Sequence, residues 1–235
     1  MRCMEACAMD KTIAKHLFRD AGLPMARDMI VTRRDDRRAV AQQVVVRLGS
    51  RVVVKPSRQG SALGVAFPTG AVEIEEALCV ALAYDDRVLI EERIEGKEIT
   101  VGILERNEIE PLPVIEVRTP AGTWYDYEHR YTPGLSEHVV PAVLPEAQYL
   151  RTQELAKLAH ITLGCRDLSR VDFIVPEHGE PIILEVNTLP GMTPTSLYPD
   201  AARAVGLSFE ELVSILIRRA VQRGVHQALE RTRNG

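Results

Sequence analysis

Two acidic side chains occupy matching places in two apolar segments of the last third of the chain. Residues 170–175 (Arg-Val-Asp-Phe-Ile-Val) and 181–187 (Pro-Ile-Ile-Leu-Glu-Val-Asn) flank the turn-forming stretch 176–180, which predicts an antiparallel hairpin. With the turn centred between residues 178 and 179, one face is wholly apolar, pairing Val175 with Ile182, Phe173 with Leu184 and Val171 with Val186. The other face then places Asp172 opposite Glu185 and Arg170 opposite Asn187.

This polar face is suited to a metal ion. Two carboxylates opposed across a ladder repel each other and reduce stability unless a cation lies between them. Two carboxylates and an amide are hard oxygen ligands, which suit Mg²⁺ bound together with phosphates, whereas zinc prefers Cys and His. We therefore expect Asp172, Glu185 and Asn187 to bind magnesium beside a nucleotide. The alternative is a hairpin whose polar face is only solvated.

A second pattern concerns phosphate. The chain contains no GxxxxGKS, GxxxxGKT or GxGxxG pattern, so neither a P-loop nor a dinucleotide site is indicated. Lys55 instead ends a β-branched run, where a lysine is costly without an anionic partner. Residues 60–64 (Gly-Ser-Ala-Leu-Gly) form a small-residue loop whose backbone amides can approach phosphate. Taken alone, this pattern is equally typical of a surface turn after a strand whose lysine reaches water.

Residues 91–98 (Glu-Glu-Arg-Ile-Glu-Gly-Lys-Glu) join the two halves of the chain, a usual location for a small-molecule cleft. A charged linker would have the same composition. Glu98 alternates with Thr100 on the face opposite Ile99 and Val101, so it either accepts hydrogen bonds from ribose hydroxyls or faces water.

Hydrophobic spacing and Gly and Pro punctuation predict the elements that position these residues, and they indicate an α/β fold class with α+β character. The first lobe, 1–92, is expected to contain helices 8–20, 35–48 and 72–84 and strands 29–32, 52–54, 65–67 and 88–91. The second lobe, 93–223, is expected to contain strands 98–104 and 114–117, the hairpin, and helices 145–163 and 208–222. The polar stretch 118–145 predicts a lid loop, and 224–235 a frayed tail.

Composition limits the class of protein. The 235 residues are 46% hydrophobic and 26% charged with a formal net charge of -4, which excludes a disordered chain and a global field that attracts nucleic acid. The four cysteines lack zinc spacing and are expected to be reduced thiols. No apolar stretch suffices for a signal peptide or a membrane span. We therefore expect a cytoplasmic protein with no nucleic-acid or membrane partner.

Five motifs occur in order: Met9-Asp10-Lys11; Lys55-Pro56 with Gly60-Ser61 and Gly64; Glu91 to Glu98; Tyr125-Asp126-Tyr127 to Tyr131; and Arg170, Asp172, Glu185 and Asn187 with Pro190-Gly191-Met192-Thr193. From about residue 9 to residue 219, this pattern resembles the D-alanine–D-alanine ligases of the ATP-grasp superfamily. The resemblance implies an ATP-grasp fold, in which two α/β lobes clamp ATP. It also implies an enzyme that joins two D-alanines for peptidoglycan precursor synthesis.

The resemblance further implies roles for single residues. ATP would be bound by residues that contact its phosphates, adenine and ribose: Lys11, Lys55 and Arg130 for phosphate, Glu91, Glu92 and Ile94 for adenine, and Glu98 for ribose. Asp172, Glu185 and Asn187 would bind two Mg²⁺ or Mn²⁺ ions.

In the implied mechanism, one carboxylate attacks the γ-phosphate to give an acyl phosphate, and a second amine then attacks through a tetrahedral intermediate. Arg170 and the backbone amide of Gly191 would stabilise the oxyanion of that intermediate. Ser196 and Leu197, at the start of a helix, fall where the family binds the second carboxylate. Tyr131 on the lid would close over the substrates near Ser61.

The chain departs from the family pattern in several places. Arg130 replaces the usual lid lysine, Ala62 a common second serine, and Pro194-Thr195 a polar pair. It also begins almost at the first motif, where family members carry a further N-terminal α/β domain. A separate N-terminal domain or a homodimer is therefore expected as a partner beside D-alanine. Two alternative functions are another ATP-grasp ligase with a different second substrate and a truncated, non-catalytic ATP-binding remnant.

Overall fold

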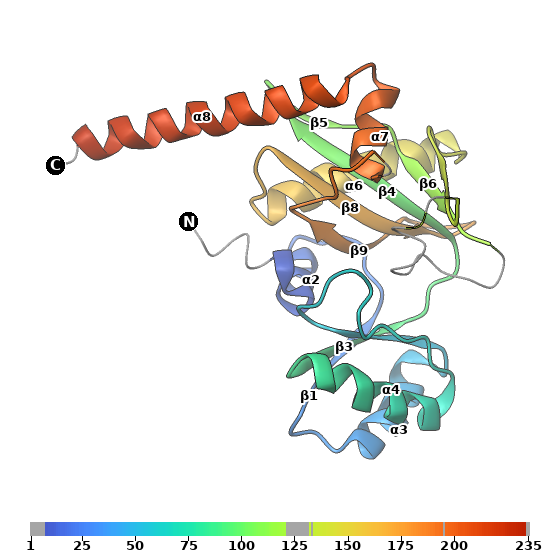
Figure 1. The fold of residues 1–235 in the computed structure, drawn as a ribbon. Coiled ribbons are helices and arrows are strands. Elements are labelled where there is room, and N and C mark those ends of the chain that lie inside the picture. The colour runs from blue at the N-terminus through green and yellow to red at the C-terminus, as the bar shows by residue number, and fades with distance from the viewer. Residues whose placement is uncertain (1–7, 121–131, 133, 195, 234–235) are drawn as a thin grey trace.

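The computed structural model describes residues 8–120, 132, 134–194 and 196–233 (Figure 1). Two antiparallel sheets, each covered by helices, form two bodies joined between strands β3 and β4. Among the described residues, no helix is both long and apolar enough to cross a membrane.

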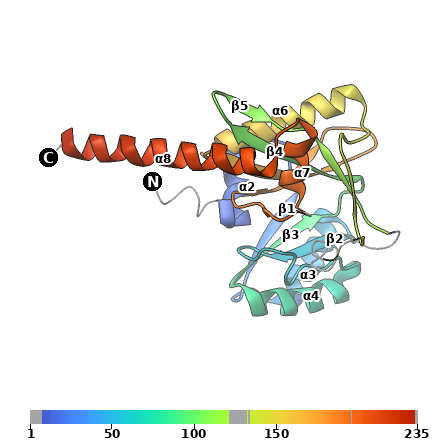
Figure 2. The same ribbon diagram turned by 45° about the horizontal axis from the view of Figure 1, so that its top comes forward.

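The smaller sheet has the strand order β1 (Asp28–Thr32), β3 (Arg87–Glu92), β2 (Val52–Pro56). Helices α3 (Arg37–Leu48) and α4 (Gly70–Tyr84) cover one face of it (Figures 1 and 2). Because side chains alternate along a strand, Val52 and Val54 enter this core while Val53 and Lys55 line a cleft on the other face.

The expected strand 65–67 is not part of the smaller sheet. Ala66 makes only an isolated bridge to Val54. The expectation was wrong because the three residues follow a tight turn and pair at a single position of the β2 edge, too short a contact for a regular ladder.

The larger sheet has the order β7-β6-β4-β8-β9, with β5 also pairing β4. Its strands are β4 (Lys97–Glu105), β5 (Ile109–Pro111), β6 (Ile115–Arg118), β7 (Glu137–Val139), β8 (Leu168–Val175) and β9 (Ile182–Asn187). Strand β7 lies inside the stretch expected to be a lid loop, so the C-terminal part of that stretch is anchored on the sheet edge.

Helices cover both faces of the larger sheet. On one face, α6 (Glu146–Thr162) and α2 (Lys11–Asp20) pack against apolar side chains of β4, β8 and β9. On the other face, α7 (Leu197–Ala204) covers β4, where the Tyr198 hydroxyl donates to the Ile103 carbonyl at 2.8 Å. Helix α8 (Phe209–Arg233) packs beside α7 and then projects from the body (Figures 1 and 2).

Two of these helices differ from expectation. Ala14 and Phe18 of α2 belong to the core of the larger sheet rather than to the core of the smaller sheet, although α2 falls within the range expected to form the first lobe. Helix α8 continues to Arg233 instead of ending at residue 222. The expectation of a frayed tail was wrong because Gly224 alone interrupts a stretch rich in helix-forming Ala, Leu, Glu, Gln and Arg.

The hairpin forms with its polar face in the predicted register. Asp172 pairs with Glu185, Arg170 with Asn187, and Val171 with Val186. Nearer the turn the prediction was wrong, because a β-bulge shifts the register and Phe173 pairs with Ile183 instead of Leu184. Ile183 thereby joins the core, where its amide also donates to the Pro24 carbonyl at 3.0 Å, while Leu184 turns towards the cleft.

Candidate active site

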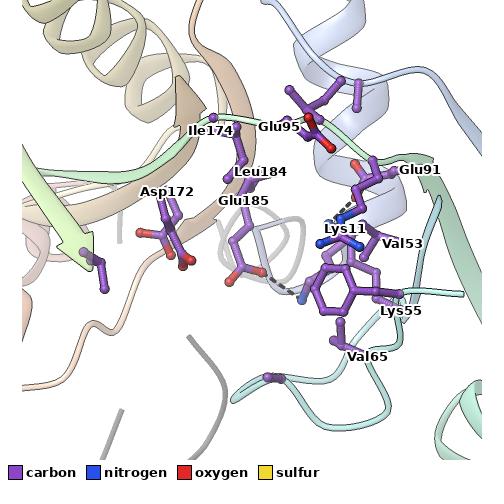
Figure 3. Close-up of a pocket in the computed structure, with 18 of the residues that line it drawn as sticks. Lys11, Val53, Lys55, Val65, Glu91, Glu95, Asp172, Ile174, Leu184 and Glu185 are labelled. Carbon is purple, nitrogen blue, oxygen red and sulfur yellow. Dashed lines mark ion pairs between the residues drawn. The ribbon is translucent and has the colours of Figure 1, made fainter. Parts of the chain in front are cut away.

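A cleft of about 660 Å³ lies between the two sheets. Val53, Lys55 and Glu91 line it from the smaller sheet, and Asp172 and Glu185 from the larger one (Figure 3). Apolar side chains of both bodies add a hydrophobic part to the wall: Val65, Phe67, Ile94, Ile174 and Leu184. Figure 3 shows the Glu185 side chain reaching the Lys11 ammonium, with Asp172 beside Glu185 on the hairpin.

A second pocket of about 260 Å³ adjoins the cleft. Lys11, Gln59, Gly60, Ser61 and Glu185 line both spaces. The second pocket also brings together residues that the sequence places far apart: Arg170, Asn187, Gly191, Ser196 and Leu197. Most residues expected at the nucleotide therefore line the larger cleft, and those expected at the amino-acid substrates line the second pocket. Asn187, expected at the metal, lines only the second pocket.

Glu91 is buried between two lysines. One carboxylate oxygen pairs with Lys55 Nζ, and the other with Lys15 Nζ, at short distances. Burial by itself raises the pKa of Glu91, but the charges of Lys55 and Lys15 and their hydrogen bonds outweigh it and hold the pKa below its usual value. The anionic partner that the sequence required for Lys55 is thus Glu91.

Lys11 extends from the first turn of α2 to the hairpin. Its ammonium lies 3.0 Å from Glu185 Oε2 and donates to the Gln59 carbonyl at 2.7 Å. The start of α2 is fixed by Asp10, whose carboxylate caps the helix and accepts from Ser57 Oγ at 2.7 Å. Burial raises the pKa of Asp10, but hydrogen bonds from Thr12 and Ser57 lower it more.

Asp172 is held by two neighbours. Arg170 donates to both carboxylate oxygens, from Nε at 2.8 Å and from a terminal nitrogen at 2.7 Å. Thr100 Oγ1, directly opposite on β4, donates to Oδ1 at 2.6 Å. The sequence placed Thr100 on this face of the sheet but gave no signal that β4 pairs with β8, so its contact was missed.

The oxygen donors of the hairpin fit Mg²⁺ better than zinc. Asp172, Glu185 and Asn187 offer only carboxylate and amide oxygens on one face of two paired strands. Over the described ranges, no group of three or more His, Cys, Asp and Glu side chains forms a metal site by itself. A magnesium ion here would therefore need further oxygens, and nucleotide phosphates supply them in many enzymes.

The loop after β2 has an unusual backbone. Ser61 and Ala62 are consecutive non-glycine residues with φ of 51° and 60°, a left-handed conformation that few such residues adopt. The turn is closed by the Leu63 amide donating to the Gly60 carbonyl at 3.1 Å. Such strain is concentrated at ligand sites, and both residues line the cleft.

Gly191 lies directly against Ser196. A Cβ on Gly191 would lie 2.7 Å from Ser196 Oγ, so a side chain does not fit without a local shift. Ser196 is the N-cap residue of α7, and its hydroxyl accepts from the Thr193 amide at 3.0 Å. The loop between β9 and α7 is therefore folded tightly at the second pocket.

The junction between the two bodies is closely packed at one point. A Cβ on Gly96 would lie 2.4 Å from the Val175 carbonyl oxygen. Glu92 accepts from the backbone amide of Arg27 at 2.9 Å and from its Nε at 2.7 Å, while Ile94 and Glu98 line the cleft. Arg130 and Tyr131 lie outside the described residues.

Sequence reasoning missed two further features of the cleft. Lys15 has a buried side chain that reaches Glu91, and its signal was the four-residue spacing from Lys11, which places both on one face of α2. The Arg93 guanidinium lies 5.2 Å from the centroid of the Phe67 ring, at the rim. Nothing in the sequence indicated this pair, because the two residues come from separate loops.

Comparison with known proteins identifies the family. The family model described as D-ala D-ala ligase C-terminus matches residues 17–218. The D-alanine–D-alanine ligase of Halalkalibacterium halodurans is 43% identical over 220 residues, which are 93% of this chain and 71% of that protein. That of Desulforamulus reducens is 40% identical, over 92% of this chain and 70% of its own length. The chain belongs to the D-alanine–D-alanine ligase family.

Solved structures of the family agree with this assignment. The D-alanine–D-alanine ligase of Bacillus anthracis superposes with a TM-score of 0.80 at 31% identity, covering 94% of this chain and 70% of the other. VanG D-Ala:D-Ser ligase from Enterococcus faecalis gives a TM-score of 0.78 at 32% identity, covering 90% and 61%. The expected ATP-grasp fold of the D-alanine–D-alanine ligase family is confirmed.

Proposed function

We propose that this chain binds ATP in the larger cleft and joins two D-alanines through an acyl phosphate, the reaction of its family, for peptidoglycan precursor synthesis. One observation carries the proposal. Lys11, Lys55, Asp172 and Glu185 line one cleft, and this cleft adjoins the second pocket, which Arg170 lines. A related structure from Bacillus anthracis, 28% identical with a TM-score of 0.78, is described as complexed with ATP.

The nucleotide is proposed to lie with its base against the apolar wall and its phosphates near the two lysines. Glu91, Glu92 and Ile94 would contact adenine partly through their backbone, and Glu98 would bind ribose. Asp172, Glu185 and Asn187 would hold two Mg²⁺ or Mn²⁺ ions, which neutralise phosphate charge and polarise the transferred phosphoryl group when bound. The support is chemical: the carboxylates of Asp172 and Glu185 line the same cleft as the ammonium groups of Lys11 and Lys55.

The substrates are proposed to bind in the second pocket. Developing negative charge on the tetrahedral intermediate would be stabilised by the Arg170 guanidinium and the Gly191 amide. The carboxylate of the second D-alanine would lie at Ser196 and Leu197, because the first backbone amides of a helix have no partner within the helix and attract anions. Ser61 would contact the first substrate from the strained loop.

Four further parts of the proposal concern the lid, the lobes, the assembly and the location of the protein. Within residues 118–145, the part before β7 would act as a lid, with Arg130 on phosphate and Tyr131 over the substrates. The lobes would divide near residue 92, and a separate N-terminal domain or a homodimer would complete the assembly, in the cytoplasm. The chain spans about 70% of the length of the relatives compared above.

A second candidate function is the joining of D-alanine to a different acceptor. It is favoured by one comparison, the TM-score of 0.78 to a ligase named for D-alanine and D-serine. An acceptor panel of D-alanine, D-serine and D-lactate separates the two candidates, because the preferred acceptor gives the largest kcat/KM.

The test of the proposed function is nucleotide binding followed by turnover. Calorimetry with ATP and MgCl₂ should show one site, and phosphate release should require D-alanine and yield the dipeptide. Arg170→Met is the matched control, because it should bind ATP but release little phosphate. Absence of ATP binding contradicts the proposal, and binding without any turnover favours the non-catalytic remnant.

A further inference from the structure

The most deeply buried group of charges in the described part of the chain lies behind the cleft, where the residues of helix α2 meet the smaller sheet. Lys15, Lys55 and Glu91 have side chains that are 4%, 9% and 3% exposed. Charged groups are rarely buried to this extent unless they are paired. The family roles considered above use Lys55 and Glu91 but leave Lys15 without a function.

Lys15 is held by contacts from several elements. Besides Glu91 Oε1, its ammonium donates to the Ala26 carbonyl at 3.2 Å and lies 3.7 Å from Asp28 Oδ1. Asp28 is also paired with Arg19, one helical turn further along α2, at 2.6 Å. Lys15 therefore bridges α2 to two neighbouring strands of the smaller sheet, β1 and β3.

The position of Lys15 relative to the cleft is the informative point. Lys55 and Glu91 line the cleft, whereas Lys15 lies behind them and is absent from its wall. Glu91 therefore divides its charge between one lysine that faces the cleft and one that does not. Without Lys15, the whole charge of Glu91 would act on Lys55.

The formal charges of the buried groups support the same inference. Lys15 and Lys55 carry two positive charges and Glu91 and Asp28 carry two negative charges, so the buried charges balance. Replacing Lys15 by a neutral residue would leave one negative charge in excess. Buried charges are weakly screened by solvent, so this excess would oppose the binding of a polyphosphate.

We propose that Lys15 is a positioning residue for nucleotide binding: by pairing with Glu91 from behind, it weakens the attraction of Glu91 for the Lys55 ammonium, which can then also bind phosphate. This inference rests on the proposed ATP site and adds a residue to it. The competing explanation is that Lys15 only ties α2 to the smaller sheet. That explanation predicts a loss of stability without a change in the affinity of the folded protein for nucleotide.

The experiment measures binding of ADP and ATP, each with MgCl₂, by calorimetry on the whole chain, together with thermal unfolding. Lys15→Gln keeps a donor for Glu91 and the Ala26 carbonyl but loses the charge, and we expect its Kd for ATP to rise about tenfold. Lys15→Arg keeps the charge and should remain within about threefold of wild type. Lys15→Met removes both the charge and the donor, and its Kd should rise at least as much as that of Lys15→Gln.

Arg19→Met is the matched control. It removes one positive charge from the same face of α2, and Asp28 loses an ion-pair partner, but Glu91 does not. Its Kd should change less than about twofold, because the Arg19 side chain is 49% exposed and its charge is screened. An equal effect of Arg19→Met and Lys15→Gln overturns the proposal, because a general charge effect would then explain both.

A double-mutant cycle tests whether Lys15 acts through Lys55. In a Lys55→Met background, Lys15→Gln should change the Kd less than about twofold. Unchanged ATP affinity of folded Lys15→Gln overturns this inference alone. Failure of the wild-type chain to bind either nucleotide overturns the proposed function as well, so the two outcomes are distinguishable.

Discussion

The Lys11 ammonium lies 3.0 Å from Glu185 Oε2, and this ion pair joins helix α2 to strand β9. It connects a group proposed to bind phosphate with a group proposed to bind metal. A magnesium ion on Glu185 therefore competes with Lys11 for the carboxylate, and phosphate competes with Glu185 for the ammonium. Metal and nucleotide should consequently bind together more favourably than either binds alone.

Glu185→Gln tests this coupling. The Gln amide carries no negative charge, so it forms no ion pair with Lys11 and is a weaker magnesium ligand. The Kd for ATP in MgCl₂ should therefore rise by about tenfold or more. In EDTA the Kd should stay the same or fall, because Lys11 is released from its partner. Calorimetry in the two buffers provides the comparison, and an equal loss of affinity in both would contradict the assignment of Glu185 to the metal.

Thr100→Val tests the contact that orients Asp172. The substitution is close to isosteric and removes the hydrogen bond of 2.6 Å from the hydroxyl to Oδ1. We expect kcat to fall about five- to tenfold, since Asp172 is then held by Arg170 alone, with a loss of about 1 kcal/mol in the free energy of unfolding. Steady-state kinetics and urea unfolding measure both, and the matched control is Thr100→Ser, which keeps the hydroxyl. A Thr100→Ser variant as slow as Thr100→Val would show that packing matters instead.

Gly191→Ala tests the tight loop at the second pocket. Its Cβ would lie 2.7 Å from Ser196 Oγ, so the Ser196 hydroxyl must turn away from the Thr193 amide, and a misplacement at the substrate site can cost up to about 10²-fold in rate. ATP affinity should change little, because Gly191 lies outside the larger cleft. The comparison variant is Gly224→Ala, where no atom lies within 4 Å of the new Cβ. That control should keep full activity and gain about 0.5–1 kcal/mol of stability as an Ala within α8.

Asp85 gives the protein a pH-dependent component of stability. Burial raises the pKa of this carboxyl, but hydrogen bonds from the Arg58 side chain and from the Arg87 and Arg58 amides outweigh it and lower the pKa to about 2. Because the folded-state pKa lies below the unfolded value, the stabilisation is present above about pH 4 and is lost as the pH falls towards 2. Its size is about 2 kcal/mol.

Asp85→Asn should therefore be less stable than wild type at pH 7, and the difference in unfolding free energy should shrink between pH 4 and pH 2. Urea unfolding across this range measures it. Asp86→Asn serves as the control, because the Asp86 side chain is 73% exposed in its pair with Arg33 and should give less than about 0.5 kcal/mol at any pH. Parallel pH curves for wild type and Asp85→Asn would refute the assignment.

Local pattern was sufficient for much of this fold. Asp172, Glu185, Arg170 and Asn187 were placed in their correct pairs because a hairpin needs only alternation and a short turn to define its register. Hydrophobic spacing along the chain likewise predicted helices α3, α4 and α6 and the strands with three or more buried residues. Strands β5 and β7, each of three residues at a sheet edge, carried no such pattern.

At the β-bulge, the alternation of apolar residues no longer predicted which side chain enters the core. Alternation favoured Leu184 for the core, yet Ile183 occupies it, since the chain after α2 runs beside β9 and bonds to the Ile183 amide through Pro24. That neighbour is distant in sequence, and its position depends on where α2 packs. The apolar character of Leu184 thereby serves the cleft wall instead of the core.

The sequence by itself determined the chemical groups of the candidate site, because the order and spacing of Lys11, Lys55, Asp172, Glu185 and Asn187 are properties of the chain. Only the tertiary structure decided how these charges are paired. Helix α2 packs its apolar side on the larger sheet, so that Lys11 reaches Glu185 in the cleft and Lys15 reaches Glu91 from behind it. Ion pairing depends on distances between segments far apart in sequence, and those distances exist only once the two bodies have packed.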